Sequence, residues 1–228
     1  MIELVALDLA GTTVEEHGDV YGALRDAVAA EGATVDDAVL RRWMGTDKRE
    51  AIAALVAAGG AGLLDPAGVE RAYGGFRRML EDRYRARPPV PVPGVPEALG
   101  RLRARRVKVV LTTGFAHDIA EPMLARLGWR VGGDLVDALV CVDEVPAGRP
   151  APYLVFRAME RTGVQAVARV LVACDTLADL RSGTNAGAGA VVGVATGALS
   201  LADLGAERHT HLLPSADLPA LVAGLDGE

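Results

Sequence analysis

Cysteine is scarce in this chain of 228 residues, which has only Cys141 and Cys174. Two thiols so far apart are too few for a disulfide framework or a cysteine zinc site, so we expect reduced thiols in the core. Charged residues interrupt every long apolar run, and no membrane span is predicted. The first residues run directly into a strand pattern and lack the basic region and cleavage site of a signal peptide. The expected location is the cytoplasm.

The chain also lacks positive charge overall, because 30 acidic residues outnumber 24 basic ones and give a net charge of -6. Without a broad positive field to attract polyphosphate backbones, nucleic-acid binding is not expected. A local basic site for one small phosphate is compatible with this balance. The length allows one domain of average size with a smaller one inserted.

The first apolar run ends at a carboxylate, Asp8, and Gly11, Thr12 and Thr13 follow closely. Such a run predicts a buried strand of a parallel sheet. An Asp at the carboxyl end of a strand can attack phosphorus, and the loop amides around Gly11 and Thr12 can bind the oxygens of a transferred phosphoryl group. A strand with an ordinary polar turn explains the stretch equally well. The functional interpretation therefore depends on partners further along the chain.

The pattern from residue 14 to 88 is helical, and from residue 96 onward helices and strands alternate. This alternation predicts a doubly wound α/β core with a parallel sheet, formed by residues 1–13 and 89–228, and an inserted all-helical cap at 14–88. A Pro-rich stretch at 88–94 forms an extended link. Cap helices are expected around Tyr21 to Ala29, over 36–43, from Asp47, and from Pro66 toward Arg85. Further strands are expected near 107–111, 135–142, 170–173, 190–194 and 211–213, and further helices near 95–105, 116–127, 152–161, 177–186, 200–204 and 216–222.

Polar residues follow several of the predicted core strands, as Asp8 follows the first. Ligands of open parallel sheets bind at the carboxyl ends of the strands. Thr112, Thr113 and Gly114 follow one strand, Arg149 lies after the next, and Asp175 ends another. A nucleophilic carboxylate, a hydroxyl and a cation around phosphate, with a second carboxylate for a divalent metal, make a complete phosphoryl-transfer site.

These stretches, taken in order, resemble the four motifs of the haloacid dehalogenase superfamily of hydrolases. The resemblance implies that Asp8 is the nucleophile that becomes an aspartyl-phosphate, and that Arg149 is the third-motif cation. It implies that Thr113, rather than Thr112, supplies the second-motif hydroxyl. The loop residues Gly11, Thr12, Thr112 and Gly114 would then contact the substrate.

The same resemblance implies a Mg²⁺ ion as cofactor. Asp8, Asp175 and Asp179 would hold the ion together with the backbone carbonyl of Ala10. Asp179 has a simpler alternative, because it could complete a capping box with Thr176 at the start of a helix.

Ala10 narrows the range of reactions expected within the superfamily. Most phosphatases of the superfamily have a second Asp at this position, which protonates the leaving alcohol and later activates water. The run from Asp8 to Thr13 is similar to the Asp-x-Ala-Gly-Thr-Thr motif of the phosphonatase branch, which includes the phosphonoacetaldehyde hydrolases. Met44, Gly45 and Lys48 match the cap segment Met-Gly-x-x-Lys of that branch. The resemblance implies that Met44 and Gly45 lie against the substrate and that Lys48 forms a Schiff base with its aldehyde.

A protonated imine next to the C–P bond acts as an electron sink, which turns the carbon into a viable leaving group. The start of a helix favours a neutral amine at Lys48, whereas Asp47 acts in the opposite direction. A solvated lysine on the cap surface is the alternative. The chain departs from the aldehyde hydrolases at Phe115, where they have Tyr, and at Ala51, where they have His.

The sequence therefore predicts a Mg²⁺-dependent hydrolase that cleaves the C–P bond of a small organophosphorus substrate such as phosphonoacetaldehyde. A phosphomonoesterase or phosphomutase of the same superfamily is the first alternative, and a phosphate-binding protein without turnover is the second. The resemblance also implies a homodimer formed through the cap. Tyr21, Tyr73 and Phe76 would give that dimer an apolar patch, or they would pack inside the cap. His117 could reach the site from the loop after Thr113, although a place on a helix surface suits it better.

Overall fold

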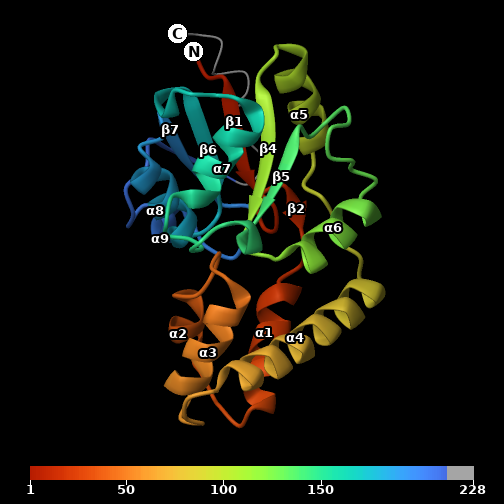
Figure 1. Ribbon diagram of the computed structural model, residues 1–228, viewed down its shortest axis with the longest axis vertical. Coiled ribbons are helices and arrows are strands. Elements are labelled where there is room, and N and C mark those ends of the chain that lie inside the picture. Colours follow the sequence, from red (N-terminus) through yellow and green to blue (C-terminus); the bar gives the residue numbers. More distant parts are fainter. Residues whose placement is uncertain (215–228) are drawn as a thin grey trace.

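A computed structural model describes residues 1–214 of the chain. Six parallel strands form one sheet in the order β5-β4-β1-β6-β7-β8 (Figure 1). In chain order they are β1 (Leu4–Asp8), β4 (Lys108–Thr113), β5 (Ala138–Cys141), β6 (Val170–Cys174), β7 (Ala190–Val194) and β8 (His211–Leu213). In the sheet, Asp8 is paired with Thr112 of β4, and Leu7 with Ala173 of β6. The chain continues from β1 to strands on both sides of it, so a topological switch point lies beside the end of β1.

Helices cover both faces of the sheet. The helices α5 (Val95–Ala104) and α6 (His117–Arg126) cover one face, and α7 (Tyr153–Thr162) and α8 (Leu177–Ala186) cover the other, while the short α9 (Leu201–Leu204) contacts β7 and β8. Successive side chains of a strand point to opposite faces. The side chains of β1 accordingly divide between two hydrophobic clusters, one on each face. Burial on both faces explains the unbroken apolar run, and the predicted doubly wound α/β fold is confirmed.

Four helices form a separate block that faces the carboxyl ends of the strands (Figure 1). They are α1 (Asp19–Ala30), α2 (Asp37–Arg41), α3 (Lys48–Ala58) and α4 (Pro66–Ala86). The side chains of Asp36, Asp47 and Asp65 accept backbone N–H groups at the starts of α2, α3 and α4. Such caps satisfy donors that a helix leaves free, which is why these helices begin where the sequence predicts. The limits 14 and 88 of a cap domain stay a prediction.

The two connections between the helical block and the sheet pair with each other. The strands β2 (Val14–Glu15) and β3 (Val90–Pro91) are antiparallel. The expectation that helix follows directly after Thr13 was therefore wrong for Val14 and Glu15, because a two-residue strand carries no periodicity. The strand expected over 135–142 covers only Ala138–Cys141, and Val142–Glu144 forms a 3-10 turn. The helix expected over 216–222 lies outside the described residues.

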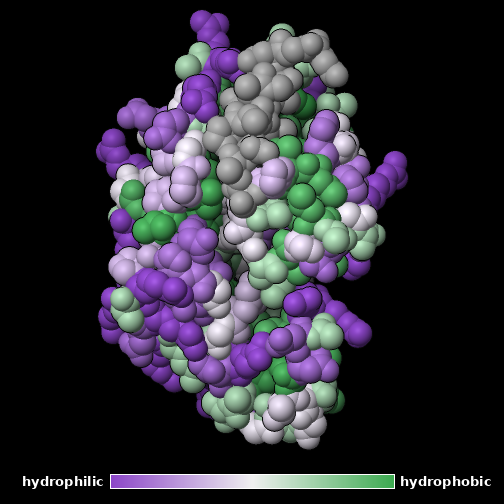
Figure 2. All heavy atoms as spheres, turned by 180° about the vertical axis from the view of Figure 1, so that it is seen from behind, coloured by the Kyte–Doolittle hydropathy of each residue, from purple (hydrophilic) through white to green (hydrophobic). Residues whose placement is uncertain are grey.

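Tyr73 and Phe76 are only 3% and 0% exposed, so they pack inside the helical block and form no surface patch. Figure 2 shows hydrophilic side chains over much of the opposite face, which is indented at one edge between the sheet part and the helical block. Within residues 1–214, no helix combines the length and the apolar character that crossing a membrane requires.

Candidate active site

Asp8 ends β1 and is 6% exposed. A guanidinium nitrogen of Arg149, Nη1, lies 2.6 Å from Oδ1 of Asp8 and 2.7 Å from Oδ1 of Asp179. Nη2 of Arg149 donates a hydrogen bond of 2.9 Å to the hydroxyl of Thr112. Burial raises the pKa of Asp8, while Arg149 acts to lower it. The ion pairs therefore hold both carboxylates in fixed orientations at the end of the sheet.

Asp175 directly follows β6, and Thr12 donates a hydrogen bond of 2.8 Å to its Oδ1. Its other oxygen, Oδ2, lies against two loops. A Cβ atom added to Gly11 would lie 2.3 Å from this oxygen, and one added to Gly197 would lie 1.9 Å from it. Gly11 also has φ +92, a conformation that favours glycine. Burial raises the pKa of Asp175 well above its usual value, and the charge of Asp8 raises it further. These glycines allow the backbone to approach the carboxylate closely.

Asp179 lies in the first turn of α8 and is 1% exposed. The Thr176 hydroxyl donates to Oδ2 of Asp179 and accepts the Asp179 backbone N–H at 3.4 Å. Burial raises the pKa of Asp179 to about 7, although Arg149 acts to lower it. Thr176 thus caps the helix, but the predicted capping box is incomplete, because the Asp179 carboxylate accepts the Thr176 hydroxyl rather than its backbone N–H. Asp179 also faces Arg149 from the same turn of the helix.

The site holds three buried carboxylates, those of Asp8, Asp175 and Asp179. The positive charges of Arg149 and Lys48 act on Asp8. Crowded carboxylates in a site of low polarity repel one another, which raises their pKa values. A divalent cation would relieve that repulsion, and hard ions such as Mg²⁺ prefer oxygen ligands. The donor set therefore fits the predicted Mg²⁺ ion, with Asp8 and Asp175 as the residues that would hold it.

Thr113 and Thr112 occupy different places at the end of β4. The Thr113 hydroxyl accepts the backbone N–H of Phe115 at 3.1 Å and lines the cavity beside Asp8. Thr112 instead lies beside Arg149. This arrangement is compatible with Thr113 as the second-motif hydroxyl, a role that stays a prediction.

Lys48 is the first residue of α3, and its side chain is buried, with 4% exposure. The ammonium Nζ donates a hydrogen bond of 2.7 Å to the Thr46 carbonyl and lies 5.3 Å from the centroid of the Phe115 ring. Burial lowers the pKa of Lys48 to about 8, while the charges of Asp47 and Asp8 raise it. The alternative of a solvated lysine on the cap surface was therefore wrong.

A cavity of about 20 Å³ lies between the sheet and the helical block, and Asp8 and Lys48 both line it. Its volume suits about one water molecule. Ala10, Gly45, Thr113 and Gly114 are among its other lining residues. The cavity is therefore too small for an organophosphorus substrate, and we expect the helical block to move when a substrate binds.

The predicted substrate-contacting residues of the cap lie in two environments. Gly45 lies against the core, since a Cβ atom there would be 2.2 Å from Oγ1 of Thr176 and 2.7 Å from Oδ2 of Asp179. Met44 is 7% exposed and packs in the hydrophobic cluster on the α7 and α8 side of the sheet. Gly45 thus lines the cavity, whereas the side chain of Met44 packs in the core.

The sequence analysis missed three residues that line the cavity, namely Glu16, Val20 and Tyr21, of which Tyr21 was considered only for a surface patch or cap packing. Both oxygens of Glu16 accept backbone N–H groups, from Gly18 at 3.0 Å and from Val20 at 2.7 Å. Burial raises the pKa of Glu16. The helical spacing of Tyr21 indicated a buried face, but the surface that this face meets is set by the docking of the helical block.

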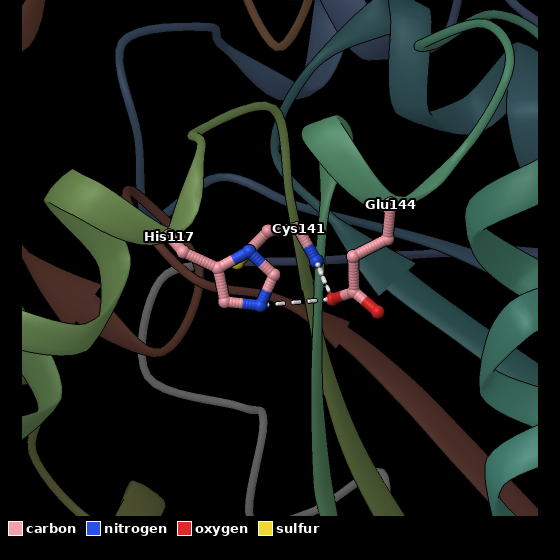
Figure 3. A group of neighbouring side chains, drawn as sticks. All are labelled: His117, Cys141 and Glu144. Carbon is pink, nitrogen blue, oxygen red and sulfur yellow. Dashed lines mark hydrogen bonds and ion pairs between the residues drawn. The ribbon is translucent and has the colours of Figure 1, made fainter.

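His117 lies at the start of α6 and belongs to a second group of polar side chains with Cys141 and Glu144 (Figure 3). Its Nε2 lies 3.2 Å from Glu144 and its Nδ1 lies 2.9 Å from Asp143. Arg161 binds the other oxygen of Glu144. Protein partners thus account for both ring nitrogens of His117, and His117 is not among the residues that line the cavity beside Asp8.

Comparison with known proteins identifies the family. A family model described as haloacid dehalogenase-like hydrolase matches residues 2–187. The chain belongs to the haloacid dehalogenase-like hydrolases. A phosphonoacetaldehyde hydrolase of Bacteroides fragilis is 30% identical over 97% of this hydrolase and 86% of its own length. One of Parabacteroides distasonis is 40% identical over 47% of this chain, in a match that spans only 39% of that relative.

Solved structures share the fold of this hydrolase. A phosphonoacetaldehyde hydrolase-like protein from Oleispira antarctica has a TM-score of 0.80 at 23% identity and covers 99% of this chain and 93% of its own. A β-phosphoglucomutase from Clostridium difficile has a TM-score of 0.82 at 15% identity, with full coverage of both chains. At such identities the structures show the fold alone. The curated relatives make this chain a phosphonatase-like member of the family, and the prediction of an enzyme of the hydrolase class is confirmed.

Proposed function

We propose that this hydrolase cleaves the C–P bond of a small oxo-phosphonate such as phosphonoacetaldehyde, through an imine on Lys48 and an aspartyl-phosphate on Asp8. The observation that carries the proposal is the position of Lys48. Its amine is buried and lines the same small cavity as the carboxylate of Asp8, with a pKa lowered to about 8. A lysine with no catalytic task is rarely buried without a carboxylate partner.

The proposed reaction begins with the amine of Lys48. The lysine ammonium and the substrate carbonyl together give a protonated imine and one water molecule. An Oδ atom of Asp8 then attacks phosphorus in line, and the C–P bond breaks. The bonding pair moves to carbon and is delocalised into the imine as an enamine. Protonation of that carbon and hydrolysis of the imine release the aldehyde product and restore Lys48, and water hydrolyses the aspartyl-phosphate.

Arg149 stabilises the negative charge of the transferred group. It is buried between Asp8 and Asp179, so its guanidinium is already oriented when phosphorus arrives. The amides of the loop at Gly11 and the hydroxyl of Thr113 are the proposed contacts of the phosphoryl oxygens. When bound, Mg²⁺ supplies further positive charge next to the oxygens of the phosphoryl group.

A phosphomonoesterase or phosphomutase is the second candidate, supported by the shared fold of β-phosphoglucomutases. Ala10 opposes it, because a methyl group cannot protonate a leaving alkoxide. If ester hydrolysis is the true activity in weakened form, Ala10→Asp should raise the turnover of small phosphate esters.

The test uses an unusual feature of the chain, which contains only two lysines, Lys48 and Lys108. Wild-type protein is incubated with phosphonoacetaldehyde and Mg²⁺, with and without borohydride. Phosphate release is measured, and the reduced adduct is located by peptide mass spectrometry. Lys48→Arg keeps the charge but cannot form the imine under these conditions. Lys108→Arg is the matched control, because Lys108 is exposed at the opposite end of β4.

We expect phosphate release in wild type and Lys108→Arg, an adduct on Lys48 in both, and neither in Lys48→Arg. Absence of release and of an adduct in the wild type would exclude this substrate class. Release from phosphate esters alone would then support the phosphatase or phosphomutase. Stabilisation by Mg²⁺ and phosphate, without release from any compound, would support a binding protein.

A further inference from the structure

The cavity beside Asp8 has few groups that can donate a hydrogen bond to the organic half of a substrate. Ala10, Val20 and Phe115 contribute apolar surface to its lining. The Thr176 hydroxyl already donates its hydrogen to Asp179. An oxygen on the carbon that Lys48 attacks therefore needs a donor from elsewhere in the lining.

Glu16 cannot be that donor in its ionised form, because a carboxylate only accepts hydrogen bonds. Both of its oxygens are held by backbone N–H groups at the start of α1. This contact fixes the first turn of α1 beside the cavity. Tyr21 lies on the same turn.

Tyr21 comes from the helical block but packs against the hydrophobic clusters on both faces of the sheet. It lines the cavity that holds Asp8 and Lys48. Within residues 1–214 its hydroxyl makes no hydrogen bond, whereas the hydroxyl of Tyr73, in the same block, donates to Asp118 at 2.9 Å. Tyr21 is half-buried, and it packs at the edge of both clusters. Its hydroxyl is therefore free to bind a molecule that enters the cavity.

The surroundings keep the Tyr21 hydroxyl protonated. Burial raises its pKa, and the charges of Asp175, Glu16 and Asp8 raise it further. A neutral phenol can donate a hydrogen bond.

We propose that Tyr21 is a catalytic residue whose hydroxyl donates a hydrogen bond to the carbonyl oxygen of the substrate. As Nζ of Lys48 bonds to the carbonyl carbon, the π electron pair moves to this oxygen, and the phenol stabilises the developing negative charge. The oxygen later leaves as the water molecule of imine formation. The inference rests on the proposed function, since it assigns a role in the formation of the Lys48 imine.

The test compares wild type, Tyr21→Phe and Tyr153→Phe. Tyr153→Phe is the matched control because Tyr153 is 42% exposed on α7. The rate of Lys48 adduct formation under borohydride and the kcat of phosphate release are measured with phosphonoacetaldehyde. The midpoint of thermal unfolding is recorded for each protein.

We expect Tyr21→Phe to slow adduct formation and kcat by at least about tenfold, as for other donors to a developing oxyanion. Its unfolding midpoint should match the wild type, because the lost hydroxyl has no protein partner. A Tyr21→Phe protein with both rates within about twofold of the wild type would overturn this inference and leave the proposed function standing. A wild type without any adduct would overturn both.

Discussion

A Cβ atom on Gly114 would lie 2.6 Å from the carbonyl oxygen of Gly45, so the loop after β4 touches the backbone of the helical block directly. A residue larger than glycine at position 114 would displace one of these two segments. The contact lies at the rim of the cavity that holds Asp8 and Lys48. Closure of the site thus depends on the absence of a side chain at Gly114.

The variant Gly114→Ala should hold the helical block away from the sheet. Its backbone needs no positive φ, so the fold itself should tolerate alanine. We expect kcat/KM to fall about tenfold or more, because Lys48 reaches the substrate only when the site closes. Steady-state phosphate release measures the effect.

The matched control is Gly100→Ala, since a Cβ atom there meets nothing within 4 Å in the helix α5. It should keep full activity and gain about 0.5–1 kcal/mol of stability from helix propensity. Equal activity in Gly114→Ala and wild type would contradict a requirement for this contact.

The pH dependence of imine formation should follow Lys48. Burial lowers the pKa of Lys48 to about 8, so about a tenth of the amine is neutral at pH 7 and half at pH 8. The neutral amine is the nucleophile, so the rate of adduct formation should rise about fivefold between pH 7 and pH 8 and then level off. Borohydride trapping over pH 6–10 measures it. A rate that keeps rising to pH 10 would indicate an amine with an ordinary pKa.

Replacing Lys48 by Met should abolish turnover but stabilise the fold. The ammonium binds its proton less tightly in the folded protein than in the unfolded chain, so below pH 8 its burial costs on the order of 1–3 kcal/mol, and this cost disappears as the pH rises from 8 toward 10.5. Denaturant unfolding at pH 7 should therefore give a higher free energy of unfolding for Lys48→Met. The exposed Lys108→Met should change it little. A less stable Lys48→Met would show that the lysine stabilises the fold.

Magnesium should stabilise the protein through Asp175. A ligand that binds only the folded state adds about 2.7 kcal/mol at a hundred times its dissociation constant. We expect Mg²⁺ to raise the thermal midpoint of the wild type, and the increase should be lost in Asp175→Asn. Asp37→Asn is a surface control, since the side chain of Asp37 is 69% exposed. A similar increase in all three proteins would place the ion elsewhere.

Much of the core was predictable because its signals are local. The apolar runs at β1, β4 and β6 and the polar residues after them give both the strands and the cluster of Asp8, Arg149 and Asp175. Parallel strands bring their carboxyl ends together whatever lies between them. These side chains could therefore be placed near one another from the sequence alone.

The surroundings of Lys48 could not be derived in this way. Its burial depends on the docking of the helical block onto the loop at Gly114, which joins segments more than sixty residues apart. The same is true of Tyr21, whose spacing defines a helix face but not the surface opposite it. The pairing of β2 with β3 was missed because strands of two residues carry no pattern.

The pairing of Val14–Glu15 with Val90–Pro91 brings the two ends of the helical block together on a single ribbon. The intervening residues leave and re-enter the core at nearly the same point, so the pairing of the strands in the sheet does not depend on the length of the block. One helical block can therefore replace another in evolution while Asp8, Arg149 and Asp175 keep their geometry. In the proposed mechanism, Lys48 belongs to this exchangeable block, whereas Ala10 and the groups proposed for phosphoryl transfer belong to the sheet part. The two halves of the proposed reaction would then come from parts of the chain that can vary separately.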